Sequence, residues 1–106
     1  ANSSNDPSVN GAMFYAPSSA NSYLSADVIS ASNTLASTML SFYCSTTGLA
    51  NKGVLQDDNM TGINWCTIPV TIVEMGFMSN QKMANSEFQA VIAQGLANGI
   101  DAYFGR

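Results

Sequence analysis

The chain has 106 residues and therefore makes one domain or less. Hydrophobic residues make up 46% of it, which is enough for a core, whereas charged residues make up 9%, against about 25% in ordinary soluble domains. The net charge is −4, and the three basic residues are Lys52, Lys82 and Arg106. Nucleic acids and anionic membranes attract clustered cations, so this charge argues against both as partners. No apolar run reaches the roughly 18 residues of a membrane-spanning helix.

The residue types also limit the chemistry that this chain can do alone. It contains no histidine, so it lacks the commonest metal ligand and the commonest acid–base group, and no Ser–His or Cys–His nucleophile pair can form within it. Its two cysteines, Cys44 and Cys66, are too far apart to make a metal motif. Their apolar surroundings favour buried free thiols. A disulfide stays open, because it needs Cα atoms within about 7 Å of each other.

The first third of the chain begins with a loop and a short strand. Residues 1–11 are a polar cluster of turn-forming residues and read as a loop. Residues 13–15, Met-Phe-Tyr, form an apolar run between Gly11 and Pro17 and predict a brief strand.

A second short strand is expected over residues 52–56, before the acidic turn Asp57-Asp58-Asn59. Adjacent aspartates invite a cation, but a calcium loop needs oxygens at alternate positions and a closing Glu, so a solvated turn is favoured. Residues 60–66 mix polar and apolar side chains around Gly62, and either a short strand or an irregular loop fits them.

Two long helices are predicted, over residues 18–43 and 86–104. Pro17 and the serines after it signal the first start, Gly48 supplies the stop, and apolar residues recur along one face: Leu24, Val28, Ala31, Leu35, Met39 and Phe42. Phe42 and Tyr43 are expected in the core. In the second helix, Ser86 and Gln89 resemble a capping box, and the apolar stripe is Phe88, Ile92, Leu96, Ile100 and Phe104. Gly95 and Gly99 beside that stripe indicate either close packing of another backbone or a weak helix.

The most informative stretch follows Pro69. Residues 70–74, Val-Thr-Ile-Val-Glu, lack clean alternation, which predicts a strand covered on both faces, as in a parallel sheet. Glu74 ends this strand, and Gly76 and Ser79-Asn80 follow at once. A buried carboxylate is costly unless paired, and ligands bind at the carboxyl ends of strands in open α/β sheets. Glu74 is therefore either a functional-site residue or a solvent-exposed residue at the end of the strand.

This stretch also carries a family resemblance. Residues 71–80, TIVEMGFMSN, resemble the "L-V-E-x-G-F-x-S-N" signature of zinc-dependent N-acetylmuramoyl-L-alanine amidases of bacterial cell-wall hydrolases and endolysins. The resemblance extends over almost the whole chain. It includes the opening segment up to Tyr15, the helix from Ser18, the closing residues 99–103, and residues 51–54, NKGV, which are similar to the family's "N-R-G-V" with Lys52 in place of Arg.

The resemblance implies a fold and a function. We expect an α/β fold: part of a mixed, mainly parallel sheet covered by the helices 18–43 and 86–104. Residues 1–106 would be the C-terminal portion of a single amidase catalytic domain. The implied activity is zinc-dependent cleavage of the amide bond between N-acetylmuramic acid and L-alanine of the peptidoglycan stem peptide, outside a bacterial cell or in its wall, by an endolysin or an autolysin.

The resemblance also assigns a role to Glu74, as the general base and acid beside a zinc-held water. The family's zinc ligands are two histidines and a glutamate, and this chain resembles the part of the domain that contains none of them. The isolated chain is therefore expected to hold no zinc, to be inactive by itself and to need the missing N-terminal half of the domain. The link from Asn80 to Ser86 also looks shorter than the acidic, helical link usual in the family.

Two alternatives from other classes remain. The chain could be a non-catalytic module that binds the cell wall, for which Glu74 would be dispensable. It could also be a self-associating fragment, forming a homodimer through sheet edges that a missing half leaves exposed.

Overall fold

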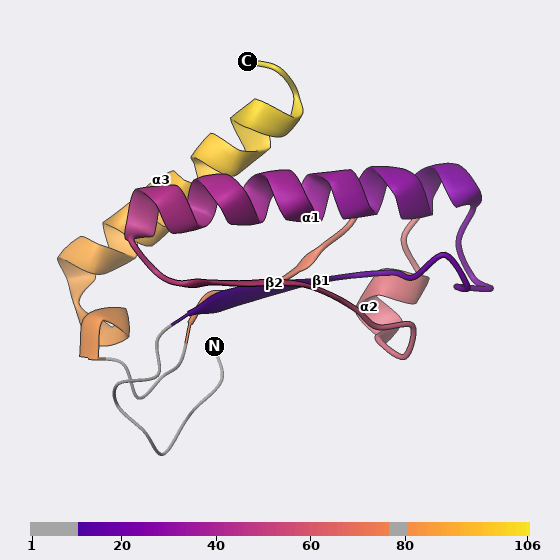
Figure 1. The fold of residues 1–106 in the computed structure, drawn as a ribbon, viewed down its shortest axis with the longest axis horizontal. Helices are drawn as coiled ribbons and strands as arrows, with labels where there is room; N and C mark the ends of the chain where they lie inside the picture. Colours follow the sequence, from indigo (N-terminus) through magenta and orange to yellow (C-terminus); the bar gives the residue numbers. More distant parts are fainter. Residues whose placement is uncertain (1–10, 77–80) are drawn as a thin grey trace.

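The computed structural model describes residues 11–76 and 81–106. Three strands, three α-helices and a 3₁₀ helix follow one another in these residues. In chain order they are β1 (Ala12–Ala16), α1 (Ala26–Thr47), β2 (Asn51–Gln56), α2 (Thr61–Asn64), β3 (Ile72–Glu74), η1 (Gln81–Ala84) and α3 (Ser86–Tyr103). Figure 1 shows α1 lying along the strands, with α3 crossing α1 obliquely and α2 on the other side of the strands in this view.

The strands form a mixed sheet in the order β2-β1-β3. β1 runs parallel to β2 and antiparallel to β3, with Met13 opposite Glu74 and Tyr15 opposite Ile72. The expected α/β fold, with a mixed sheet covered by two long helices, is confirmed. Among the described strands, one ladder is parallel and one is antiparallel. All three strands lie within one or two residues of the predicted ranges.

α1 begins later than predicted, at Ala26 instead of Ser18. The reason is local: the side-chain oxygen of Asn21 accepts hydrogen bonds from the amides of Tyr23 and Leu24, which holds this segment in a turn. Ser25 is extended and caps the helix by accepting from the amide of Val28. The predicted stop is confirmed, because Gly48 takes the left-handed conformation (φ 74°) and donates its N–H to the Cys44 carbonyl.

The buried face of α1 differs from the predicted stripe. Phe42 was expected in the core but is 46% exposed, whereas Tyr43 is fully buried as expected. The buried positions of α1 combine three small residues with three large ones: Ser32, Ala36 and Thr47 with Met39, Leu40 and Tyr43. The Ser32 hydroxyl also accepts a hydrogen bond from the amide of Val70 at 2.9 Å, which ties the segment before β3 to this helix.

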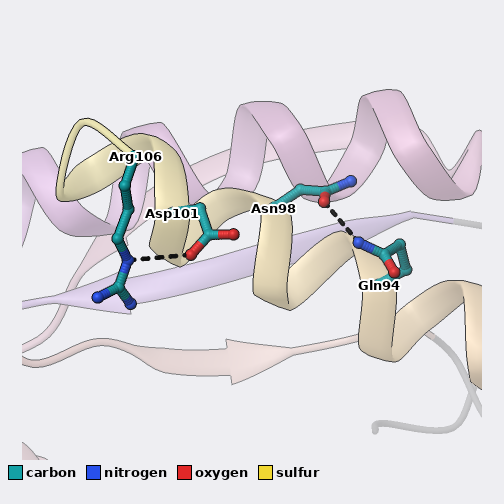
Figure 2. A network of polar contacts seen from close by, with 4 residues as sticks. All are labelled: Gln94, Asn98, Asp101 and Arg106. Carbon is teal, nitrogen blue, oxygen red and sulfur yellow. Dashed lines mark hydrogen bonds and ion pairs between the residues drawn. The ribbon is translucent and has the colours of Figure 1, made fainter.

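α3 matches its prediction closely but has a different cap. Asn85, not Ser86, is the N-cap, and its side chain accepts from the amides of Glu87 and Phe88. Gln89 donates to the Met83 carbonyl, so the predicted capping box does not form. Gln94 donates to Asn98 one turn further along the helix (2.7 Å), and Arg106, beyond the end of the helix, pairs with Asp101 (3.1 Å), as Figure 2 shows.

The two glycines of α3 mark close packing of another backbone, as predicted. A Cβ added at Gly99 would lie 2.7 Å from the Cα of Met39, and one at Gly95 would lie 3.3 Å from the carbonyl oxygen of Tyr43. The two long helices therefore touch backbone to backbone. Beneath them, Phe14 of β1 packs its ring 5.7 Å from that of Tyr43, and this contact forms the centre of the core.

Residues 61–64 form a helical turn, so both expectations for this segment, strand and irregular loop, were wrong. The turn buries Ile63 completely and directs Asn64 to the neighbouring acidic turn. That turn is not simply solvated either. Asp58 accepts hydrogen bonds from the backbone N–H of Ser18 (2.9 Å), the Ser18 hydroxyl and the side chain of Asn21 (2.8 Å).

Both cysteines are free thiols and are half-buried. Burial raises the pKa of the Cys44 thiol. Cys66 donates its S–H to the Gly62 carbonyl. None of the helices in residues 11–76 and 81–106 combines the length and apolar character needed to cross a lipid bilayer.

Candidate active site

Glu74 lies at the last position of β3, opposite Met13 near the start of β1. Because β3 is antiparallel to the other two strands, its carboxyl end meets their amino ends. The rule for parallel sheets, which suggested a site at a shared carboxyl edge, therefore does not describe this part of the sheet. The position of Glu74 at a strand end is nevertheless as predicted.

The side chain of Glu74 is half-buried, and one of its oxygens has an unusual environment. Oε2 is buried and accepts no hydrogen bond from the residues that the structure describes. A buried carboxylate oxygen without a donor is destabilising, since it loses water and gains nothing in exchange. Such groups are rare in folded proteins and are frequently kept for chemistry. Glu74 is thus not the freely hydrated end of a strand.

The backbone next to Glu74 is held by a tyrosine of α1. The hydroxyl of Tyr43 donates a hydrogen bond of 2.8 Å to the carbonyl of Met75. Burial, with a smaller effect of the neighbouring Cys44, raises the pKa of Tyr43 to about 12, so the phenol remains a proton donor at all ordinary pH values. The sequence analysis placed Tyr43 in the core but did not predict that its hydroxyl would bond to the backbone beside Glu74. The feature that could have indicated this bond is a hydroxyl group at an otherwise apolar helix position.

Gly76 closes the strand end. It is buried, has φ 154°, and a Cβ there would lie 3.0 Å from the sulfur of Met83. A larger residue would crowd the side chain of Met83 and would be strained by this backbone conformation. The remainder of the signature, residues 77–80, lies outside the described residues. The link that follows Asn80 consists of η1 (Gln81–Ala84) and Asn85, the N-cap of α3.

The donor set for a catalytic zinc is not present in this chain. The sequence has no histidine, and no cluster of three or more His, Cys, Asp and Glu side chains occurs within residues 11–76 and 81–106. Catalytic zinc takes three protein ligands of these kinds. The residues present therefore do not fit a zinc site by themselves, although a lone carboxylate such as Glu74 fits the proton-transferring group beside one.

Residues 1–102 match the protein family described as N-acetylmuramoyl-L-alanine amidase. The chain belongs to this amidase family. The resemblance read from residues 71–80 is thereby confirmed. Amidases of this family act on cell-wall peptidoglycan and generally depend on zinc. No curated protein sequence matches the chain.

Solved amidase structures share the fold. The catalytic domain of CwlV, an N-acetylmuramoyl-L-alanine amidase from Bacillus (Paenibacillus) polymyxa var. colistinus, is 30% identical with a TM-score of 0.76; the match covers 99% of this chain and 54% of that one. AmiC2 of Nostoc punctiforme is 24% identical with a TM-score of 0.78, and the match covers 100% of this chain and 55% of AmiC2. Ami1 from Mycobacterium smegmatis is 22% identical with a TM-score of 0.80, and the match covers 98% of this chain and 51% of Ami1. The chain thus spans about half the length of these amidases.

Proposed function

We propose that this chain is the C-terminal portion of an amidase catalytic domain and supplies its proton-transferring carboxylate, Glu74. The reaction is hydrolysis of the amide bond between N-acetylmuramic acid and the L-alanine of the stem peptide, outside a bacterial cell or in its wall. The family match supports the reaction class. The assignment of the residue rests on Oε2 of Glu74, which is buried and has no hydrogen-bond partner in the part of the chain that the structure describes.

Amide hydrolysis needs a proton removed from the attacking water and a proton delivered to the leaving amine. A carboxylate at one position can do both in sequence, accepting the proton first and returning it when the C–N bond breaks. Oε2 is suited to this task because no hydrogen bond within the described residues competes for it. When bound in the complete domain, zinc would supply a more acidic water and polarise the amide carbonyl.

Two features of the fold support Glu74 in this role. Tyr43 fixes the carbonyl of the next residue, and the pairing of Val73 with Phe14 sets the register of the strand. Together they orient the side chain from a rigid element, which proton transfer requires. The zinc ligands must come from polypeptide other than this chain, because it has no histidine. The isolated chain is accordingly proposed to bind no catalytic zinc and to have no turnover.

The test of function joins Ala1–Arg106, as one polypeptide, to the part of the Paenibacillus polymyxa catalytic domain that it does not cover. Release of L-alanine amino groups from purified peptidoglycan is then measured. Glu74→Gln should lower turnover by about 10²–10⁴-fold, the usual contribution of a general acid–base group. Glu87→Gln, on the exposed first turn of α3, is the matched control and should leave turnover unchanged. Equal activity of the two variants would refute the role of Glu74.

The isolated chain is tested separately. Elemental analysis should find no stoichiometric zinc, and the same peptidoglycan assay should detect no release of amino groups. One zinc per chain together with turnover would contradict the proposal that the ligands lie elsewhere. A wall-binding module would instead be retained on peptidoglycan equally with and without Glu74→Gln.

A further inference from the structure

We propose that Lys52 binds a carboxylate of the stem peptide, at the same end of the sheet as Glu74, and thereby helps the site to recognise the peptide side of the scissile amide. The inference rests on the proposed function, since it takes the substrate to be an N-acetylmuramoyl peptide. Lys52 would hold the substrate and take no part in the proton transfer assigned to Glu74.

A β-bulge in β2 sets the direction of the Lys52 side chain. The pairing of β1 with β2 shifts by one residue between Ala12 and Phe14, so that Met13 faces two residues of β2. Those two residues are Lys52 and Gly53. Gly53 has φ 93°, a backbone conformation that favours glycine. Bulges of this kind are common next to active sites, where they change the direction of a side chain.

Two further contacts fix the bulge and the lysine. The side-chain oxygen of Asn51 accepts a hydrogen bond of 2.8 Å from the amide of Gly53, which holds the backbone in this conformation. On the neighbouring strand, a Cβ added at Gly11 would lie 2.7 Å from both Cγ and Cε of Lys52. The stem of the lysine therefore lies against the backbone of Gly11, in space that a side chain at that position would fill. Asn51, Gly53 and Gly11 together set the path of one cationic side chain.

Lys52 and Glu74 lie at the same end and on the same face of the sheet. Met13 faces Glu74 on one side and the bulge on the other. Ala12 is fully buried in the core beneath α1, so alternation along β1 turns positions 11 and 13 toward the opposite face. The stem of Lys52 lies at position 11, and Glu74 is paired with position 13, so both belong to that opposite face. Neighbouring strands are about 4.8 Å apart, which places the bulge about 10 Å from Glu74 across the sheet.

The ammonium group of Lys52 is available to a ligand. The residue is exposed and forms no ion pair with a carboxylate in residues 11–76 and 81–106. Arg106, another cation whose side chain the structure describes, is paired with Asp101 at the end of α3. Figure 1 shows that end of the chain beyond α1, on the side away from the strands. Among the described side chains, Lys52 therefore provides the positive charge at the Glu74 end of the sheet, in a chain whose net charge is −4.

The substrate offers this cation a carboxylate on one side of the scissile bond. On the N-acetylmuramoyl side, the carboxyl group is already part of the amide, and the sugar carries uncharged hydroxyl and amide groups. The peptide side ends in a carboxylate, and acidic side chains add others. An extended peptide advances about 3.3–3.6 Å per residue, so a separation of about 10 Å corresponds to the second or third residue after the scissile amide. A carboxylate there would accept a charge-assisted hydrogen bond from Lys52.

The experiment uses the joined polypeptide described above, with Glu74→Gln so that binding is measured without turnover. The probe is a synthetic N-acetylmuramoyl tripeptide with L-alanine first and glutamate second, and binding is measured by titration calorimetry. Lys52→Gln should weaken binding at least about tenfold, because a charge-assisted hydrogen bond is lost, whereas Lys52→Arg keeps the charge and should stay within about threefold. Arg106→Gln removes the same charge at the end of α3 and is the matched control, which should change binding less than about twofold.

Two amidated probes identify the carboxylate. One carries an amide in place of the glutamate side-chain carboxylate, and the other carries an amide in place of the C-terminal carboxylate. The loss caused by Lys52→Gln should disappear with one of them. In the polypeptide that retains Glu74, Lys52→Gln should raise KM and leave kcat within about twofold, the pattern of a residue that binds the ground state and the transition state equally.

Three results would overturn the proposal: equal losses from Lys52→Gln and Arg106→Gln, a loss from Lys52→Gln that persists when both carboxylates are amidated, or no binding of the tripeptide. Circular dichroism of each variant checks that the polypeptide stays folded. Failure of the proposed function is a separate result. It would appear as tripeptide binding that depends on Lys52, together with turnover that Glu74→Gln does not lower.

Discussion

Two carboxylates stand at opposite ends of the same small sheet, and their surroundings are opposite too. Asp58, just beyond the carboxyl end of β2, accepts hydrogen bonds from Ser18 and Asn21, while Asn64 donates to its carbonyl. Glu74, at the end of β3, has a buried oxygen that accepts none within the described residues. Asp58 thus acts in folding, tying the 18–21 turn to α2. The buried oxygen of Glu74 destabilises the folded state, as expected of a residue that is retained for chemistry.

The largest expected effect is a loss of stability in the core, and it tests whether the Asp58 and Glu74 ends of the sheet depend on the same core. Phe14 lies on β1, which pairs with both other strands, and it is fully buried against Tyr43. Phe14→Ala should lower the free energy of unfolding by about 3–5 kcal/mol, measured by urea denaturation. Phe104→Ala, at an exposed position, should cost less than about 1 kcal/mol. If Phe14→Ala and Phe104→Ala lower the free energy of unfolding by similar amounts, the Asp58 and Glu74 ends of the sheet do not depend on a core centred on Phe14.

The next effect has the opposite sign. Glu74→Met replaces a carboxylate whose buried Oε2 has no hydrogen-bond partner in residues 11–76 and 81–106 by an apolar side chain of similar length, and should stabilise the isolated chain by about 1–3 kcal/mol. Glu87→Met on the exposed first turn of α3 should stay within about 0.5 kcal/mol of the parent. The comparison of the two carboxylates fails if Glu74→Met destabilises the chain.

Tyr43→Phe tests the support of the Glu74 end. It removes the hydrogen bond to the Met75 carbonyl and should cost about 1–2 kcal/mol, with faster amide exchange at the end of β3. Because the pKa of Tyr43 is raised to about 12, its contribution is present below the ordinary value near 10 and is lost as the pH rises toward 12. The stability of Tyr43→Phe should therefore fall less steeply in that alkaline range. Tyr23→Phe, at an exposed tyrosine, should keep the parent's profile.

The smallest effect concerns the Asp58 end. Hydrogen bonds from the Ser18 side chain, the Ser18 backbone and Asn21 lower the pKa of Asp58. A lowered pKa in the folded state means that the contribution to stability is present above the unfolded value, near 4, and is lost as the pH falls below it. Asp58→Asn and Ser18→Ala should therefore flatten the acid limb of the stability–pH profile. Ser19→Ala, at an exposed neighbour, should leave that limb unchanged.

Local patterns were good guides wherever a few adjacent residues decide the outcome. Gly95 and Gly99 indicated backbone contact with another element, and α1 is that element. Gly48 indicated the end of a helix. The predictions failed where a side chain reaches a partner that the pattern cannot show. Asn21 bonds to nearby amides and delays α1, and Asn64 reaches Asp58, which favours a helical turn over a strand or loop.

The sequence alone determined the family, the mixed α/β class, the two long helices and the end position of Glu74, because signature residues and apolar periodicity are local properties of the chain. The tertiary structure decided that Glu74 has a buried oxygen with no donor among the described residues, that Tyr43 holds the neighbouring carbonyl, and that β3 is half-buried beside an apolar hollow. These depend on which distant segments meet, and burial and hydrogen bonding arise only when they do.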